Sequence, residues 1–225
     1  MAIELPSSAA LSRRGFLGMA GAGLAAAGLV ACGLDNGAAP DLRTQEKGKG
    51  FAGDLQSPPL QKPDVTFTDM YGKPFPFREK TAGKLAILFF GYTSCPDVCP
   101  IFLQTMSRAL DAIGDGPGSD PMVLFVGVDV ARDTPEALQT YLEAFDPSFL
   151  GLTGTEKVIA EANKQMLMPS IVIQEPDEDG NYLVLHSAKV FPFTPDDVAH
   201  RIYPPDVRQQ QLIADLPRLA QGTYK

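Results

Sequence analysis

The sequence predicts an α/β domain in which a central mixed β-sheet is flanked by helices. Two near-continuous apolar runs, residues 85–92 (LAILFFGY) and 122–130 (MVLFVGVDV), have the composition of strands that are buried on both faces. Each run is followed by a segment in which apolar residues recur at helical spacing, and a β-rich stretch comes later in the chain. A strand–helix–strand–helix order followed by a hairpin is typical of a sheet with helices packed against it.

The composition narrows the possible functions. The chain has 225 residues, of which 44% are hydrophobic, so it can form one domain with a substantial core. Its net charge of −8 argues against nucleic acid as a partner, because contacts with phosphates need clustered Lys and Arg. Three cysteines are too few for a disulfide-scaffolded miniprotein, and two histidines are too few for a histidine-rich metal site. Any chemistry therefore depends on a small number of reactive side chains.

The first elements of the folded part follow from local patterns. Residues 64–69 (DVTFTD) alternate polar and apolar side chains, and a turn at residues 72–74 leads to residues 75–77, which predicts an N-terminal hairpin. Apolar residues at helical spacing predict a helix over residues 96–113, directly after the first buried strand. Residues 133–136 (DTPE) combine a polar cap, a proline and an acid, and they predict the start of the next helix.

The second half continues with helix and strand signals. A helix is predicted near residues 155–166, and strands are predicted within residues 170–174 and 182–193, on either side of a turn. Residues 194–197 (TPDD) predict the cap of one more short helix. The tail after residue 205 is predicted to be helical, with an inward face made of Leu212, Leu216 and Leu219.

Residues 1–32 have the features of an export signal. Arg13 and Arg14 precede an uncharged segment rich in Gly and Ala, as in a twin-arginine signal. The segment ends in LVACG, which resembles a bacterial lipoprotein box, where Cys32 becomes the lipidated N-terminus. The alternative is an uncleaved anchor helix. Both interpretations predict a protein anchored at the outer face of the cell membrane, outside the cytoplasm, and the lipid anchor is the favoured one.

Residues 33–62 are predicted to be a flexible tether between the anchor and the domain. They are polar, rich in Gly and Pro, and without periodicity, so they cannot bury enough apolar surface to become ordered. The folded domain is then predicted to cover residues 63–225.

Cys95 and Cys99 are the side chains best placed for chemistry. They lie in the segment TSCPDVCP, where a buried strand gives way to a helix. Their four-residue spacing is expected to put both sulfurs on one helical face, and the positive end of the helix stabilises a thiolate. The two thiols can therefore act as a metal clamp, as a redox couple that forms a disulfide, or as both.

A third metal ligand would have to come from one of the two histidines. Thiolates select Cu(I), and an added imidazole gives a three-ligand site that can also hold Cu(II). His200 falls on the predicted short helix and is interpreted as a solvated surface residue, whereas His186 lies between two apolar strands and is favoured by the nearby cysteine pair. Met166 and Met168 are soft donors, but they are interpreted as core residues that fill gaps.

Several segments resemble those of a known family. The segment GYTSCPDVCP (residues 91–100) is similar to the signature of the Sco/SenC copper-binding proteins. Further similar segments follow in the same order, namely VD at 128–129, RDTPE at 132–136, FLGLTG at 149–154 and YLVLHS at 182–187. Together they cover roughly residues 60–195.

The resemblance implies a thioredoxin-like fold in which copper is bound by Cys95, Cys99 and His186. It also implies a metallochaperone that delivers copper to the binuclear copper centre of cytochrome c oxidase. The implied partners are the copper-site subunit of that oxidase and a thiol reductant or another copper carrier. Such a protein binds and transfers a metal, and it turns over no substrate.

An enzyme is the main alternative. A membrane-tethered thiol–disulfide oxidoreductase would use the same cysteines to reduce the oxidase subunit or other exported proteins, although C-x-x-x-C differs from the C-x-x-C of thioredoxins. A thiol peroxidase of the same fold is disfavoured, because Phe89 and Phe90 stand near the point where such sites carry a proline.

Two acidic residues are candidates for supporting roles, and three positions depart from the family pattern. Asp97 is expected either to stabilise the first helical turn or to contact the site, and Asp129 lies at the carboxyl end of a central strand. Family members commonly carry His, Pro and Asp at the positions of Ser94, Val130 and Leu185. The change at Leu185 removes a carboxylate that could orient the adjacent imidazole.

Overall fold

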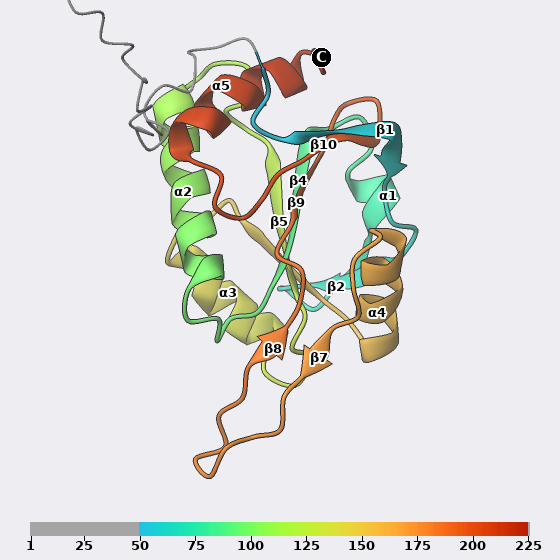
Figure 1. Ribbon diagram of the computed structural model, residues 1–225, viewed down its shortest axis with the longest axis vertical. Coiled ribbons are helices and arrows are strands. Elements are labelled where there is room, and N and C mark those ends of the chain that lie inside the picture. The colour runs from blue at the N-terminus through green and yellow to red at the C-terminus, as the bar shows by residue number, and fades with distance from the viewer. Residues whose placement is uncertain (1–49, 225) are drawn as a thin grey trace, which may run out of the picture. The chain divides into compact units, whose positions relative to one another are not determined.

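The computed structural model describes residues 50–224, and within them the main β-sheet has six strands in the order β3-β2-β6-β5-β4-β9 (Figure 1). The bounds of these strands are β2 Thr66–Asp69, β3 Pro74–Pro76, β4 Ala86–Gly91, β5 Met122–Gly127, β6 Leu150–Thr153 and β9 Val190–Phe193. β4, β5 and β6 run parallel, whereas β9 is antiparallel to β4 and β2 is antiparallel to β6. The predicted mixed sheet and the N-terminal hairpin of β2 and β3 are confirmed.

The two central strands, β4 and β5, form the middle of the hydrophobic core. All residues of β4 are buried, and five of the six in β5 are, as the two apolar runs predict. Alternate side chains of β4 enter two separate clusters, with Ile87 and Phe89 on one face of the sheet and Leu88 and Phe90 on the other. A strand buried on both faces holds its ends firmly, which positions the loop that follows it.

Helices cover both faces of the sheet. On one face lie α2 (Val98–Ile113), α3 (Pro135–Glu143) and α5 (Gln209–Ala220), whose apolar sides join the cluster around Phe89. On the other face lies α4 (Glu156–Gln165), together with the short α1 (Phe77–Lys80), as Figure 1 shows. The helices predicted over residues 96–113, after residues 133–136, near residues 155–166 and after residue 205 are confirmed, and the predicted inward face of α5 is buried.

The folded part begins earlier than predicted. β1 (Asp54–Gln61) pairs with β10 (Val198–Ile202), so the last part of the predicted tether belongs to the fold. Lys62 follows β1, and its Nζ donates to the Thr81 carbonyl and to Asp197, both at 2.6 Å. Long-range pairing with β10 orders this segment, and composition alone does not reveal such pairing. Residues 1–49, with the predicted signal, Cys32 and the start of the tether, lie outside the described residues.

The prediction of a short helix after residues 194–197 is wrong, because a turn and a strand are found there. These residues form a turn in which the Thr194 amide and hydroxyl both bond to the Val198 carbonyl, at 3.0 and 2.8 Å, and β10 follows. Asp197 has a φ of 65°, a left-handed conformation that fits a turn and not a helix start. His200 therefore lies on a strand, where its ring stacks on Tyr224 at 3.8 Å.

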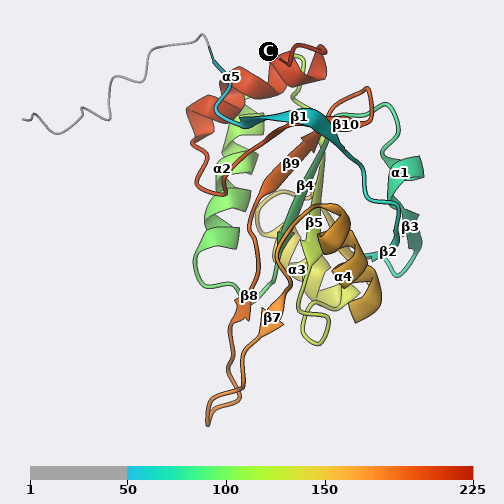
Figure 2. The same ribbon diagram turned by 45° about the vertical axis from the view of Figure 1, so that its right-hand side comes forward.

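A two-stranded hairpin extends beyond the main sheet. β7 (Val172–Ile173) pairs with β8 (Val184–Leu185), and the loop between them points away from the rest of the fold (Figure 2). β8 leads directly to His186 and then to β9. Among residues 50–224, no helix is long and apolar enough to cross a membrane.

Candidate functional site

The two cysteines lie where β4 ends and α2 begins. Cys95 is half-buried in the connecting loop, and its amide donates to the Tyr92 carbonyl at 3.1 Å. The helix starts at Val98, so Cys99 occupies its first turn and is fully buried. Both cysteines were expected on one helical face, but the turn at Tyr92 keeps Cys95 ahead of the helix. Its sulfur thereby faces the free amides of the helix N-terminus.

The environment of Cys95 stabilises a thiolate. A hydrogen bond from the Cys99 thiol is the largest cause, and the backbone N–H groups of Asp97, Val98 and Cys99 add to it. Together they lower the pKa of Cys95 to about 5 against the opposing effect of burial. Cys95 is thus ionised at neutral pH and open to a ligand.

Cys99 is its protonated partner. The pKa of Cys99 is raised, first because its thiol donates to Cys95, then because of burial and the charge on Cys95. Gly91 makes room for this sulfur, since a Cβ at that position would lie 2.8 Å from the Cys99 Sγ. The site therefore combines one accessible thiolate with one buried thiol in contact with it.

The alkylation rate of Cys95 reports this asymmetry. We expect iodoacetamide to modify Cys95 with a rate that falls as pH drops through about 5, because the reactive thiolate is then protonated. Cys99→Ala removes the largest stabilising bond, so the midpoint should move to higher pH. The measurement is peptide mass spectrometry of the reduced protein across the pH range. A midpoint near 8.5, the ordinary value for a free cysteine, would contradict the assigned environment.

Tyr92 links the cysteines to the histidine, and sequence reasoning did not single it out. It is buried, its hydroxyl bonds to the Cys95 sulfur, and its ring meets that of His186 edge-on at 5.6 Å. Burial and the negative charge on Cys95 raise the pKa of Tyr92, so its hydroxyl stays a donor. The signal for this role was its place in the sequence, at the end of a buried strand and just before the cysteine loop.

His186 lies half-buried directly after β8. Its Nδ1 is 3.3 Å from the Ser187 carbonyl, so a proton on Nδ1 would leave Nε2 free to bind a metal. Burial lowers the pKa of His186, although the Ser187 carbonyl and the charge on Cys95 oppose the shift. The imidazole is therefore neutral at pH 7, which is the form that binds metals.

The structure brings the sulfurs together more closely than it brings the imidazole to them. Among residues 50–224, no three His, Cys, Asp or Glu side chains gather as a ready-made metal site. The Cys95–Cys99 pair is in direct contact, whereas His186 is held against the ring of Tyr92 and is near enough to feel the charge on Cys95. Two sulfurs and one imidazole suit copper, and the imidazole of His186 lies beside the two cysteines.

Asp129 supports the site from a distance. It is fully buried, pairs with Arg132, and accepts a hydrogen bond from the Tyr182 hydroxyl at 3.1 Å. The Arg132 guanidinium also lies over the Tyr182 ring and donates to the Tyr182 carbonyl. Because Tyr182 is four residues before His186, Asp129 anchors the arm of the hairpin that carries the imidazole.

Asp133 holds the cysteine loop, a role that the sequence patterns did not indicate. Its carboxylate accepts from the amide and the hydroxyl of Thr93, at 2.9 and 2.7 Å, and from the Asp129 amide at 3.0 Å. Asp133 was expected to belong to the start of a helix, but Thr134 caps α3 by accepting from the Ala137 amide. The buried carboxylate fastens the loop before Cys95 to the end of β5.

The remaining candidates lie as follows. Asp97 is exposed at the N-cap of α2, and its side chain makes no capping hydrogen bond. Ser94 and Leu185 are also exposed, so neither fills a structural role in the core. Met166 and Met168 are buried in the cluster beneath α4, which agrees with their interpretation as core residues.

A mixed sheet of this order, with a reactive dithiol between its first central strand and the following helix, defines a thioredoxin-like protein. The chain matches the SCO1/SenC family over residues 54–221, and it belongs to that family.

Individual relatives agree with this assignment. The SCO2-like protein of Rickettsia conorii is 35% identical over 125 residues, which cover 56% of this chain and 60% of that protein. Mitochondrial SCO1 of Saccharomyces cerevisiae is 34% identical over 160 residues, covering 69% of this chain and 52% of that protein. This chain thus spans about half of these curated relatives.

Solved structures show the same fold. The structure of Arabidopsis thaliana ScoI with copper bound matches with a TM-score of 0.66 at 28% identity, covering 72% of this chain and 99% of that one. Apo Sco1 from Thermus thermophilus matches with a TM-score of 0.67 at 32% identity, covering 76% and 97%.

Proposed function

We propose that this protein is a copper metallochaperone that delivers copper to the binuclear copper centre of cytochrome c oxidase. The observation that carries the proposal is the accessible Cys95 thiolate in contact with Cys99 and beside the neutral imidazole of His186. Relatives whose structures were solved with copper bound support it. The proposed partners are the copper-site subunit of the oxidase, which receives the metal, and a copper carrier that supplies it.

The donor chemistry fits transfer of copper better than its permanent storage. Two thiolates satisfy Cu(I) in low coordination, and the imidazole adds the ligand that Cu(II) favours. Because Cys95 is only half-buried and His186 does not form a ready-made three-ligand cluster with the two cysteines, an incoming thiolate of a partner can replace one ligand at a time. Copper here is cargo, and the protein returns to its starting state after each transfer.

The test is the copper content of the oxidase in cells that carry single variants of this protein. We expect Cys95→Ser and His186→Ala each to lower oxidase copper and activity, with the variant proteins present at normal levels. Adding excess copper should restore part of the activity in both. If His186→Ala cells assemble the oxidase normally while Cys95→Ser cells fail, metal binding by His186 is dispensable, and the thiol–disulfide oxidoreductase becomes the favoured function.

A thiol–disulfide oxidoreductase is the second candidate, and the opposite pKa shifts of the cysteines favour it. The Cys95 thiolate can attack a target disulfide to form a mixed disulfide, and the released target thiolate takes up a proton. Cys99 then loses its proton and attacks Cys95, which frees the second target thiol and leaves a Cys95–Cys99 disulfide. A thiol reductant must restore the dithiol. This chemistry needs both cysteines and does not need His186.

We further propose that the protein is anchored in the membrane through Cys32. The lipobox and the preceding paired arginines support this localisation, outside the cytoplasm. We expect Cys32→Ser to leave the protein unprocessed or released from membranes in fractionated cells, because no lipid can be attached. Unchanged mobility and unchanged membrane attachment would show that another segment holds it.

A further inference from the structure

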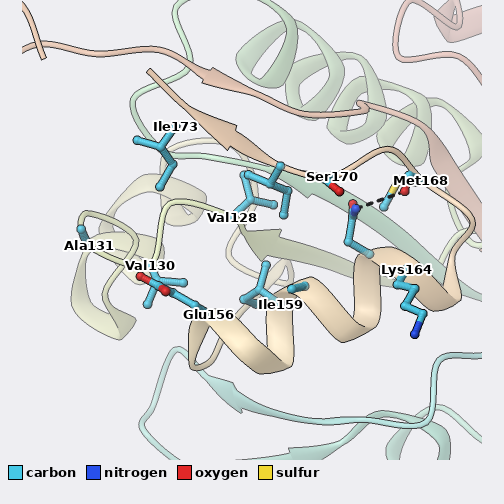
Figure 3. Close-up of a pocket in the computed structure, with 12 residues that line it drawn as sticks. Val128, Val130, Ala131, Glu156, Ile159, Lys164, Met168, Ser170 and Ile173 are labelled. Carbon is cyan, nitrogen blue, oxygen red and sulfur yellow. Dashed lines mark hydrogen bonds between the residues drawn. The ribbon is translucent and has the colours of Figure 1, made fainter. Parts of the chain in front are cut away.

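An apolar groove of about 660 Å³ lies beside the hairpin, apart from the cysteines (Figure 3). α4 provides Ile159 on one side, Val128 after β5 lies within, and Ile173 of β7 stands at the other side. Val128 and Ile159 are buried, whereas Ile173 is half exposed. The volume is in the range of pockets that bind ligands or side chains, and its lining is mainly apolar.

Exposed apolar side chains are concentrated on the hairpin that carries Ile173 and on the segment that leads to it from α4. Within residues 50–224, eight large hydrophobic side chains are about half exposed or more, and five of them fall between residues 167 and 185. These five are Leu167, Val172, Ile173, Leu183 and Leu185. Such a concentration on an otherwise polar surface is typical of a contact site for another molecule.

The outer edge of β7 has an unused backbone donor and acceptor. The Gln174 amide bonds to the Leu183 carbonyl, so this pair is a hydrogen-bonded one. In an antiparallel ladder the next pair, Ile173 with Val184, is not hydrogen-bonded, and the N–H and C=O of Ile173 point away from β8. In Figures 1 and 2 β8 lies on the far side of β7 from α4, so this edge faces the groove side.

The loop at the end of the hairpin is acidic. Glu175, Asp177, Glu178 and Asp179 follow β7 within seven residues of Ile173, and all four are exposed. The groove itself has one exposed acid and one exposed lysine, Glu156 and Lys164, at its rim. A chain that leaves the groove toward the loop therefore meets a cluster of negative charge.

We propose that this groove and the outer edge of β7 bind an extended, apolar segment of a partner protein that is flanked by Lys or Arg. The segment adds a strand to β7 through the free groups of Ile173, inserts an apolar side chain between Ile173 and Ile159, and places its basic residues against the acidic loop. The proposal does not depend on copper, so it goes beyond the proposed function. It places the partner on the hairpin that ends at His186.

The test uses defined peptides and the full-length protein. One peptide of about ten residues alternates Val and Thr and has two Lys at each end, and its twin has Glu in place of Lys. We expect the basic peptide to shift the amide resonances of Ile173 and its neighbours, and to bind about tenfold more tightly than the acidic twin.

Three variants separate the elements of the surface. Ile173→Pro removes the outward N–H without breaking a β7–β8 bond, and Ala160→Trp fills the groove from an exposed position on α4. Each should weaken peptide binding about tenfold or more, whereas Val172→Thr, on the opposite face of the strand, should leave it nearly unchanged. Thermal unfolding checks that each variant folds.

Several results would overturn the proposal. These are equal binding of both peptides, no binding of either, or binding that survives both Ile173→Pro and Ala160→Trp. Resonance shifts that depend on protein concentration alone, and disappear in Ile173→Pro, would instead assign the face to a second copy of this chain.

Discussion

Replacing either cysteine should greatly weaken the binding of Cu(I). We expect the reduced protein to bind a single Cu(I) ion per chain, and Cys95→Ser or Cys99→Ser to weaken binding at least about a hundredfold, because each removes one of two thiolate ligands. Competition with a chromophoric Cu(I) chelator measures the affinity, and circular dichroism confirms that each variant is folded.

The oxidised protein provides an independent form of the same prediction. A Cys95–Cys99 disulfide removes both thiolates without changing the sequence, so the oxidised apo-protein should take up no copper until it is reduced. Met168→Leu is the matched control, since it removes a buried soft donor that is not proposed as a ligand. Equal uptake by the oxidised and reduced forms would place the metal elsewhere.

Loss of the imidazole should weaken the binding of Cu(II) much more than the binding of Cu(I). We expect His186→Ala to weaken Cu(II) binding at least about a hundredfold and Cu(I) binding less than about tenfold, since thiolates alone hold Cu(I) in low coordination. Titrations under air and under reducing conditions measure the two affinities. The difference follows from the ligand preference of each ion and not from loss of structure.

The chain offers a matched control for this variant. His200→Ala removes the only other histidine, which lies on β10, stacks on Tyr224 and bonds to Asp196 in the preceding turn. It should leave both affinities unchanged. The disulfide reductase activity of His186→Ala should survive, because no step of thiol exchange uses the imidazole. Equal Cu(II) binding by His186→Ala and the unchanged protein would remove His186 from the site.

The central fold could be predicted because its strands carry their own signal. β4 and β5 are apolar throughout since both faces of the sheet are covered, and α2 follows with an apolar stripe. β1 and β10 could not be predicted in this way. β1 has the sequence DLQSPPLQ, which is mostly exposed, and it is ordered by pairing with β10, a partner far away in the chain.

Some residues of the candidate site could likewise be predicted from the sequence, and others could not. Cys95, Cys99 and His186 could be found from their residue types and from a family resemblance, because few other side chains can bind a soft metal. Tyr92 and Asp133 could not, since a tyrosine and an aspartate have many ordinary uses. Their roles depend on contacts across the fold, such as the bonds from Thr93 to Asp133, which lies forty positions later in the chain.

X-ray absorption spectroscopy of the copper-loaded protein tests the proposed ligand set most directly. For the Cu(II) form, we predict two sulfur ligands and the scattering pattern of at least one imidazole. The sulfur signal should fall by half in Cys95→Ser, and the imidazole pattern should vanish in His186→Ala while persisting in His200→Ala. A copper ion with no sulfur ligands, or an imidazole pattern that survives His186→Ala, would contradict this account.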